Sequence, residues 1–448
     1  MIMAKEGRLC KRYRQDWPGF LRRTVPDVIW QKLNQNVPRC TDPRVRWSPK
    51  YVVLCWVVMG WSLQRQLTER FREGNELLGA LFPRRRRCGE TYPGLVAATR
   101  RLGSDLLHHF WTDLRTTIPQ RVGARWTWHG WTVVAVDGSR IDAPRTRRNE
   151  AALGTCGLKT HPQWWVTWIT HLPTRLIWDW RQGPCNSSER SHLQHMLGTL
   201  PLSTLLVADA GFVGFDLFSD LLRADTDFLI RCGGNVTLLL EGTTQRLERS
   251  TGGTYVYLWP IRCRQERPMR LRLIVLKNKG KRVYLLTNVL ESARLSRSIA
   301  GELYRARWGI EIDYRGLKQT LDRRKVLAKT PEAGAMELSA NILALALLML
   351  QGAVAMGARV VRLSVAQALR TIRLTIEQLR GRRRMKPFAV QLCGALRDSY
   401  ERRRSKRARD WPHKKNEPPP RSPILRSLSM VEKEQIQTLE ATQRATAA

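Results

Sequence analysis

The sequence lacks the cysteine patterns that indicate a zinc finger or a disulfide framework. It contains nine cysteines, an odd number, and none of them belongs to a Cys-x-x-Cys pair. Zinc sites and small disulfide-stapled folds both depend on closely spaced cysteines, so neither is expected here. We therefore expect reduced thiols and a cytoplasmic protein.

Acidic residues are scarce relative to basic ones. Lys and Arg total 77 against 38 Asp and Glu, which gives a formal net charge of +39 and a pI near 11.0. Such an excess favours binding to a polyanion, and nucleic acid is the usual one. The basic residues extend along the whole chain, which indicates a long path of phosphate contacts. A basic protein that binds without chemistry has the same composition, but 17 Trp favour a large, well-packed enzyme.

Membrane signals are also sparse. Basic residues between 8 and 14 interrupt any apolar stretch at the start, so no signal peptide is expected. Residues 338–356 are rich in Leu and Ala but include Ser339, Asn341 and Gln351. A buried core helix is therefore expected there rather than a membrane span, and we expect no membrane partner.

The chain is long enough for two to four domains, and its pattern changes four times. Residues 1–122 are helical and suit a DNA-binding region, although a helical packing region with a basic surface has the same pattern. Strands alternate with helices over 123–232, which is typical of an α/β domain with a partly parallel sheet. Residues 233–289 predict an all-β insertion, and residues 290–380 return to helices. Residues 381–448 predict a basic, partly disordered tail; a further basic linker is expected at 84–87.

Two aspartates share one context. Asp137 follows the apolar run WTVVAV, and Asp209 follows STLLVA; each precedes a small residue and a turn. A charge there lies at the carboxyl end of a buried strand, where α/β sheets place their ligands. Asp is a common turn residue, so either one alone is weak evidence. Together, in one domain, they favour a shared cation.

A third carboxylate follows from helical geometry in the segment Glu302 to Lys318. At about 100° per residue, Tyr304, Arg307, Glu311 and Lys318 share one face, whereas Glu302 and Asp313 point to the opposite side. Glu311 is the acid set between two cations. A solvated salt bridge between Arg307 and Glu311, four residues apart, explains the same spacing.

Phosphodiester transfer explains why these residue types would occur together. Two divalent ions about 3.5–4 Å apart activate the attacking oxygen and stabilise the leaving one. Mg²⁺ prefers carboxylate oxygen and water, so Asp137, Asp209 and Glu311 suit two Mg²⁺ ions, with Mn²⁺ as a substitute. Arg307 and Lys318 would then hold flanking DNA phosphates.

These motifs resemble those of a known family. The spacing Tyr304-x2-Arg307-x3-Glu311-x6-Lys318 is similar to the Tyr-Arg-Glu-Lys signature of DDE transposases of the insertion sequence four family. The segments VVAVDGSRIDAP and LLVADAGFVGFDLF resemble that family's first two acidic motifs, and GPCNSSER between them is also similar. The resemblance covers roughly residues 125–350. It implies a ribonuclease H-like catalytic core with the β insertion placed before the glutamate helix, preceded by the helical region.

The resemblance also implies roles and partners. Asp137, Asp209 and Glu311 would be catalytic metal ligands, and Tyr304, Arg307 and Lys318 would contact DNA. The substrates would be double-stranded DNA, transposon terminal inverted repeats and target DNA, cut and joined by a homodimer at the bacterial nucleoid. Some members hold a flipped base on an aromatic of the insertion; Trp259 and Tyr284 are candidates here, although strand packing explains both equally well. A catalytically inactive DNA-binding descendant and a nuclease that cuts without joining remain alternatives.

Overall fold

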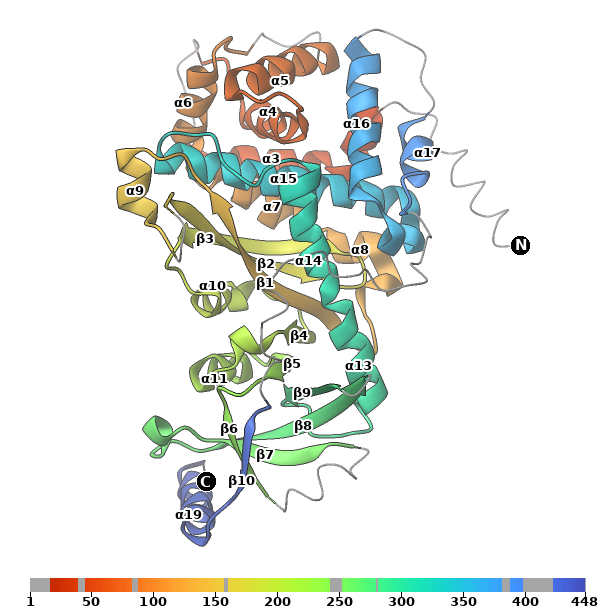
Figure 1. The fold of residues 1–448 in the computed structure, drawn as a ribbon. Helices are drawn as coiled ribbons and strands as arrows, with labels where there is room; N and C mark the ends of the chain where they lie inside the picture. Colours follow the sequence, from red (N-terminus) through yellow and green to blue (C-terminus); the bar gives the residue numbers. More distant parts are fainter. Residues whose placement is uncertain are drawn as a thin grey trace, which may run out of the picture. The chain divides into compact units, whose positions relative to one another are not determined.

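The computed structural model describes eight stretches of the chain: 17–38, 45–82, 88–156, 160–241, 252–278, 281–380, 387–397 and 422–447. The expected basic linker at 84–87, and the part of the expected tail at 398–421, lie outside these residues. The described residues form a mixed α/β fold (Figure 1). They divide into two compact units. The first contains Met1–Trp126, Gly138–Ser187 and Ile310–Asp398, and the second contains Thr127–Asp137, Ser188–Gly309 and Ser399–Ala448.

The first unit is mainly helical. Its helices are α2 (Trp17–Thr24), α3 (Asp27–Asn36), α4 (Pro49–Trp61), α5 (Leu67–Leu81), α6 (Tyr92–Leu102), α7 (Leu106–Arg115), α8 (Ile118–Val122), α9 (Arg147–Leu153), α15 (Pro331–Met356), α16 (Val365–Arg380) and α17 (Phe388–Cys393). Both α4 and α15 are apolar on every side, the pattern of helices that are buried all round. A Cβ added at Gly60 of α4 would lie 2.4 Å from the Cβ of Ala344 in α15, so only glycine permits this approach. Figure 1 shows α15 lying against the N-terminal helices.

By length and composition, α15 is the helix among those described that could cross a membrane. However, 83% of its most apolar window is buried inside the protein. This burial fits the core helix that the composition of residues 338–356 predicts. The helix begins earlier than expected, at Pro331, where the Thr330 side chain caps it by accepting a hydrogen bond from Ala333 N.

The core sheet contains five strands. β1 (Thr132–Asp142) runs from the second unit into the first, where β2 (Gln163–His171) and β3 (Leu176–Pro184) form an antiparallel pair. In the second unit, β4 (Thr204–Ala208) is parallel to β1 and to β5 (Asp227–Cys232). The order β3-β2-β1-β4-β5, with three parallel strands adjacent, is that of a ribonuclease H-like core. Strands buried on both faces read as continuous apolar runs, which is why the sequence indicates β1 and β4.

The β insertion continues this sheet. It consists of β6 (Thr237–Leu240), β7 (Thr254–Leu258), β8 (Met269–Asn278) and β9 (Lys281–Thr287), each antiparallel to the next. β9 pairs with β5, so the insertion extends the core sheet rather than forming a sheet of its own. The helices of the second unit include α10 (Glu189–Met196), α11 (Phe215–Arg223) and α13 (Arg297–Ala306).

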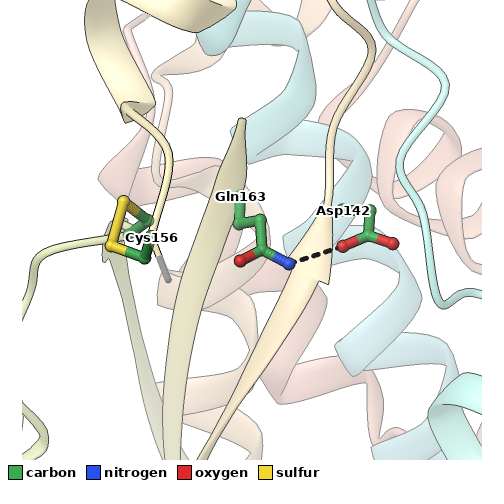
Figure 2. Close-up of a disulfide and its surroundings, with 4 residues drawn as sticks. Asp142, Cys156 and Gln163 are labelled. Carbon is green, nitrogen blue, oxygen red and sulfur yellow. Dashed lines mark hydrogen bonds between the residues drawn. A yellow bond between two sulfur atoms is a disulfide. The ribbon is translucent and has the colours of Figure 1, made fainter. Parts of the chain in front are cut away.

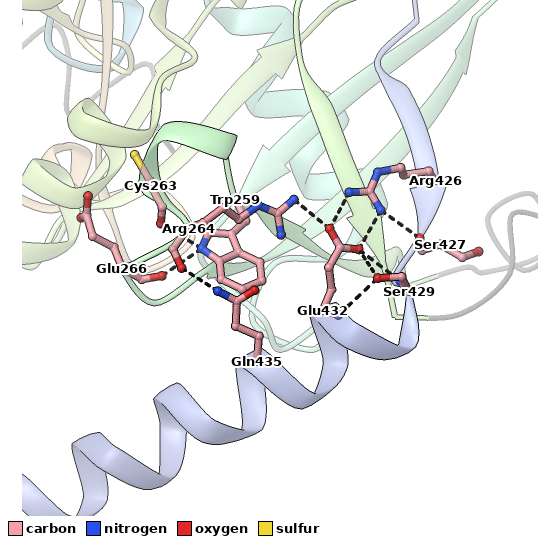
Figure 3. Close-up of polar contacts among 9 residues, drawn as sticks. All are labelled: Trp259, Cys263, Arg264, Glu266, Arg426, Ser427, Ser429, Glu432 and Gln435. Carbon is pink, nitrogen blue, oxygen red and sulfur yellow. Dashed lines mark hydrogen bonds and ion pairs between the residues drawn. The ribbon is translucent and has the colours of Figure 1, made fainter.

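The end of the expected tail is folded. β10 (Ile424–Ser427) pairs in parallel with β6, and α19 (Met430–Ala447) follows it. Ile436 of α19 packs against Trp259 and Leu239 of the insertion. Glu432 pairs with Arg264 at 2.7 Å and with Arg426 at 2.5 Å (Figure 3). The prediction of a partly disordered tail did not indicate this strand and helix, because a short edge strand depends on a partner far away in the sequence.

Candidate active site

The first two carboxylates lie on neighbouring strands. The parallel register of β1 and β4 pairs Thr132 with Thr204 and Ala135 with Val207. Continued by two residues, this register sets Asp137 beside Asp209, on strands about 4.8 Å apart. The expectation that Asp137 ends its strand was wrong, because β1 continues to Asp142. Asp137 instead lies just beyond the described pairing with β4, which ends at Ala135.

Asp209 directly follows β4 and sits in a crowded turn. Its side chain accepts a hydrogen bond of 2.9 Å from Gly211 N and caps the short helix Ala210–Phe212. A Cβ on Gly211 would lie 3.1 Å from Asp209 Oδ1 and 3.7 Å from Glu189 Oε2. Glu189, in the first turn of α10, is therefore a further carboxylate close to this turn. The sequence pattern did not indicate Glu189 as a site residue, although it lies in the segment GPCNSSER that the family resemblance includes.

Glu311 lies on α14 (Trp308–Arg315), and buried contacts hold that helix on the sheet. The Tyr314 ring stacks on Trp168 of β2, with centroids 3.7 Å apart and planes at 5°, and its hydroxyl donates to the Val166 carbonyl at 3.1 Å. Asp313 is fully buried in an ion pair with Arg175. These contacts fix which face of α14 meets the sheet. Glu311, three residues before Tyr314, is half-buried.

The glutamate helix is not continuous. α13 ends at Ala306 and α14 begins at Trp308, and residues Gly316–Thr320 form a π-helical turn. Arg307 itself keeps α-helical backbone angles, with φ −50° and ψ −36°, so the 100° step per residue changes only in the π-helical turn that contains Lys318. Glu302 is exposed, and its carboxylate lies 3.3 Å from Nε2 of His129. Asp313 is buried, because its side of α14 packs against the core.

Tyr304 and Arg307 are in contact. The guanidinium carbon of Arg307 lies 5.6 Å from the centroid of the Tyr304 ring and 5.5 Å from that of Trp308. Arg307 is 5% and Tyr304 8% exposed. A cation held between two aromatic rings gains cation–π energy. The buried position of Arg307 differs from the alternative in which Arg307 and Glu311, four residues apart, form a salt bridge in solvent.

Lys318 lies in the π-helical turn and donates a hydrogen bond of 2.7 Å from Nζ to Ser139 Oγ. Ser139 is two residues after Asp137 on β1, and alternation along a strand places both on one face. Lys318 also lines a cavity of about 310 Å³ in the first unit. The other lining residues are Arg140, Asp142, Gln163 and Arg324.

The aromatic candidates of the insertion are both packed. Trp259 is 3% exposed, and its Nε1 donates to the carbonyls of Cys263 and Glu266 at 3.0 and 2.9 Å. The Arg264 guanidinium lies 4.3 Å from the centroid of its ring (Figure 3). Tyr284 is 9% exposed on β9. In this conformation neither ring presents a free face for stacking.

One expectation about cysteine was wrong. Cys156 and Cys185 form a disulfide with their Cα atoms 6.0 Å apart (Figure 2). The two cysteines are 29 residues apart and belong to no recognisable spacing. Antiparallel packing of β2 and β3 brings their flanking segments together, which the sequence pattern did not indicate.

The donor set fits a hard cation. Asp137 and Asp209 offer carboxylate oxygens at adjacent positions, without sulfur or imidazole, and Mg²⁺ prefers such ligands. Among the residues that the structure describes, no three His, Cys, Asp or Glu side chains gather closely enough to hold a metal ion. Asp137 and Asp209 belong to the second unit, and Glu311 belongs to the first.

Comparisons with known proteins find similarity to transposases. Residues 128–347 match the family model described as a transposase DDE domain. Over 307 residues the chain is 25% identical to the transposase InsG of insertion sequence element IS4 from Escherichia coli strain K12. This alignment covers 65% of the present chain and 67% of the InsG protein. A cryo-EM structure of a piggyBac transposase synaptic complex with hairpin DNA aligns with a TM-score of 0.42 at 12% identity, covering 88% of each chain.

Proposed function

This chain belongs to the DDE transposases of the insertion sequence four family, and on that premise we propose that it cleaves DNA at transposon ends and transfers the freed strands into target DNA. One observation carries the proposal. The parallel register of β1 and β4 ends at the pair Ala135 and Val207, and its continuation by two residues would set Asp137 beside Asp209, within the segment that matches the transposase DDE domain. Two adjacent carboxylates in a strongly basic chain are suited to a divalent cation and a phosphodiester.

Asp137, Asp209 and Glu311 are the proposed metal ligands. Bound Mg²⁺ or Mn²⁺ would supply Lewis acidity toward the phosphodiester and lower the pKa of an attacking water or hydroxyl. The protein's own contribution is orientation. Gly211 N fixes one oxygen of Asp209, and the contacts of Tyr314 with Trp168 fix α14, which carries Glu311.

Arg307, Tyr304 and Lys318 are proposed to hold DNA phosphates. Arg307 is pre-oriented between the rings of Tyr304 and Trp308, which lowers the entropy lost when its planar fork binds phosphate. Lys318 is held through Ser139 on the face of β1 that carries Asp137. The substrates proposed are double-stranded terminal inverted repeats and target DNA, acted on by a homodimer at the bacterial nucleoid.

The test separates cleavage from joining. Asp137→Asn, Asp209→Asn and Glu311→Gln should each reduce strand cleavage to background while the melting temperature and end binding remain near those of the wild type. Chelation should abolish activity; Mg²⁺ or Mn²⁺ should restore it, and Ca²⁺ alone should not. Glu302→Gln, an exposed acid on the neighbouring helix, is the matched control and should cleave normally.

Joining is measured with a pre-cleaved end bearing a free 3′-hydroxyl. Strand transfer of that end supports a transposase, whereas cleavage without transfer identifies a nuclease. Absence of both in the wild type, with specific end binding retained, identifies an inactive DNA-binding descendant. Near-normal cleavage by one of the three variants removes that residue from the assignment.

A further inference from the structure

The cavity beside Lys318 carries charges of both signs. Its lining contains three cations and one carboxylate: Arg140, Lys318, Arg324 and Asp142. A phosphate offers only acceptors, so a site built for phosphate alone needs cations and no acid. A carboxylate accepts hydrogen bonds and repels an anion. The occupant that matches this cavity therefore presents hydrogen-bond donors and acceptors side by side.

Asp142 is held in place by side-chain and backbone contacts. Gln163 is 3% exposed, and its Nε2 donates a hydrogen bond of 2.7 Å to Asp142 Oδ1 (Figure 2). His161 Nε2 lies 3.0 Å from the same oxygen. The Asp142 backbone donates to the Arg324 carbonyl at 3.0 Å and accepts from Val326 N at 2.9 Å. The carboxylate is thus fixed in position, while its side chain stays 31% exposed and accessible to a ligand.

Arg140 and Arg324, the two arginines that line the cavity with Asp142, have different surroundings. The Arg140 guanidinium lies 4.8 Å from the centroid of the Trp165 ring, which orients its planar fork. The Arg324 side chain is 68% exposed. Arg140 lies three residues beyond Asp137 on β1, about 10 Å along a strand. Because side chains alternate along a strand, Arg140 and Asp142 lie on the face of β1 opposite to that of Asp137 and Ser139.

We propose that this cavity binds the base of an unpaired nucleotide in the DNA substrate, with a preference for guanine. Guanine presents the O6 and N7 acceptors to arginine or lysine, the commonest specific base contact, and its amino group donates to a carboxylate. Adenine offers one acceptor and one donor on the same edge, so it satisfies fewer of the three cations. The inference rests on the proposed function, because DNA processing is what brings a nucleotide to this part of β1.

Binding of the full-length chain to duplexes that end in one unpaired nucleotide tests the proposal. The unpaired position carries guanine, adenine, cytosine, thymine, inosine or an abasic sugar, and affinity is measured by fluorescence anisotropy in EDTA. The guanine end should bind about tenfold more tightly than the abasic end, within the range of a bidentate base contact. Inosine, which lacks the amino group, should lose part of this preference. Raising the salt should weaken all ends and leave the ratio unchanged.

Asp142→Asn and Arg324→Ala should remove the guanine preference while the abasic end binds as before. The matched controls are Glu150→Gln and Arg148→Ala, two exposed charges on α9 that pair with Arg145 and Glu332 and do not line the cavity. Both should retain the preference. Melting temperatures are taken for every variant, and the exposed Arg324 carries the test if Asp142→Asn does not fold.

Two results would overturn the proposal. One is equal affinity of the wild type for all ends, abasic included. The other is an equal loss for every end in the Arg324→Ala variant, which would indicate a phosphate contact only. This assay measures binding in the absence of metal, so it does not depend on the proposed metal site. A wrong assignment of the metal ligands would appear only in the cleavage assay, and the two failures can therefore be told apart.

Discussion

Arg175 and Asp313 form an ion pair that is almost completely shielded from water, with side chains 9% and 0% exposed. Burial raises the pKa of Asp313 to about 7, although Arg175 beside it acts in the opposite direction. Removing one partner leaves the other charge buried and uncompensated. Asp313→Ala should therefore lower the free energy of unfolding by about 3–5 kcal/mol.

Urea denaturation of Asp313→Ala, Arg175→Ala and the double variant checks this prediction. The double variant should lose less than the sum of the two single variants, because neither charge is then orphaned. Glu302→Ala, on the exposed side of α13, should change stability by no more than about 0.5 kcal/mol. A small effect of Asp313→Ala would show that the pair does not hold α14 on the sheet.

Arg307 provides a second prediction. If it holds a phosphate near the metals, Arg307→Ala should slow single-turnover cleavage of a pre-bound end by about a hundredfold, since misplacement of the phosphate disrupts alignment. Glu302→Ala, which changes one charge on the same segment, should cleave at the normal rate. Arg307→Lys keeps the charge but loses the fork, so it should recover only part of the activity. A rate loss matched by a fall in melting temperature would make Arg307 a packing residue.

A third prediction concerns salt dependence. Binding to any DNA should weaken steeply as salt rises, because neutralised phosphates release counterions. Replacing Arg402, Arg403 and Arg404 with Gln should lower general affinity and flatten the slope of log affinity against log salt, with cleavage of a pre-bound end retained. Substitution is preferable to deletion beyond residue 400, which would also remove β10 and α19. An unchanged slope would show that these arginines do not contact DNA.

The fourth prediction is a pH dependence of α19 docking. The hydrogen bond from Arg426, assisted by Ser429 N and Arg264, lowers the pKa of Glu432 from 4.5 to about 2. A carboxyl whose pKa is lower in the folded state contributes stability above its unfolded pKa, and that contribution is lost as the pH falls from about 4.5 toward 2. Amide hydrogen exchange in α19, corrected for intrinsic rates and referred to α15, should therefore rise across this range. Glu432→Gln should exchange faster at pH 6 and show little further change on acidification.

The sequence indicated most of the core because its signals are local. Strands buried on both faces produce apolar runs, so β1 and β4 were identifiable together with Asp137 and Asp209. The helical character of the N-terminal region was equally visible. The break at Arg307 was not, because the periodicity of apolar residues continues through it. The burial of Asp313 was not visible either, because it depends on Arg175, which is 138 residues away in the sequence.

Features that depend on distant partners escaped the sequence. The strand β10 is four residues long and gains its identity only from pairing with β6. The disulfide partners Cys156 and Cys185 share no spacing motif. The cavity formed by Asp142, Gln163 and Arg324 combines β1, β2 and the segment after the π-helical turn, so no single stretch of sequence contains it.

The parallel pairing of β10 with β6 has a consequence for how the protein is made. Thr237 pairs with Ile424, which the ribosome adds 187 residues later. At roughly 5–20 residues per second, the backbone groups of β6 on that side wait about ten seconds or more before their partner strand exists. During that interval the nascent chain presents an open strand edge, the kind of surface that pairs with other nascent chains. A message truncated before codon 424 yields a chain whose β6 edge never gains its partner strand. Quality control that removes such incomplete chains therefore acts on an open strand edge at β6, far along the chain from the point of truncation.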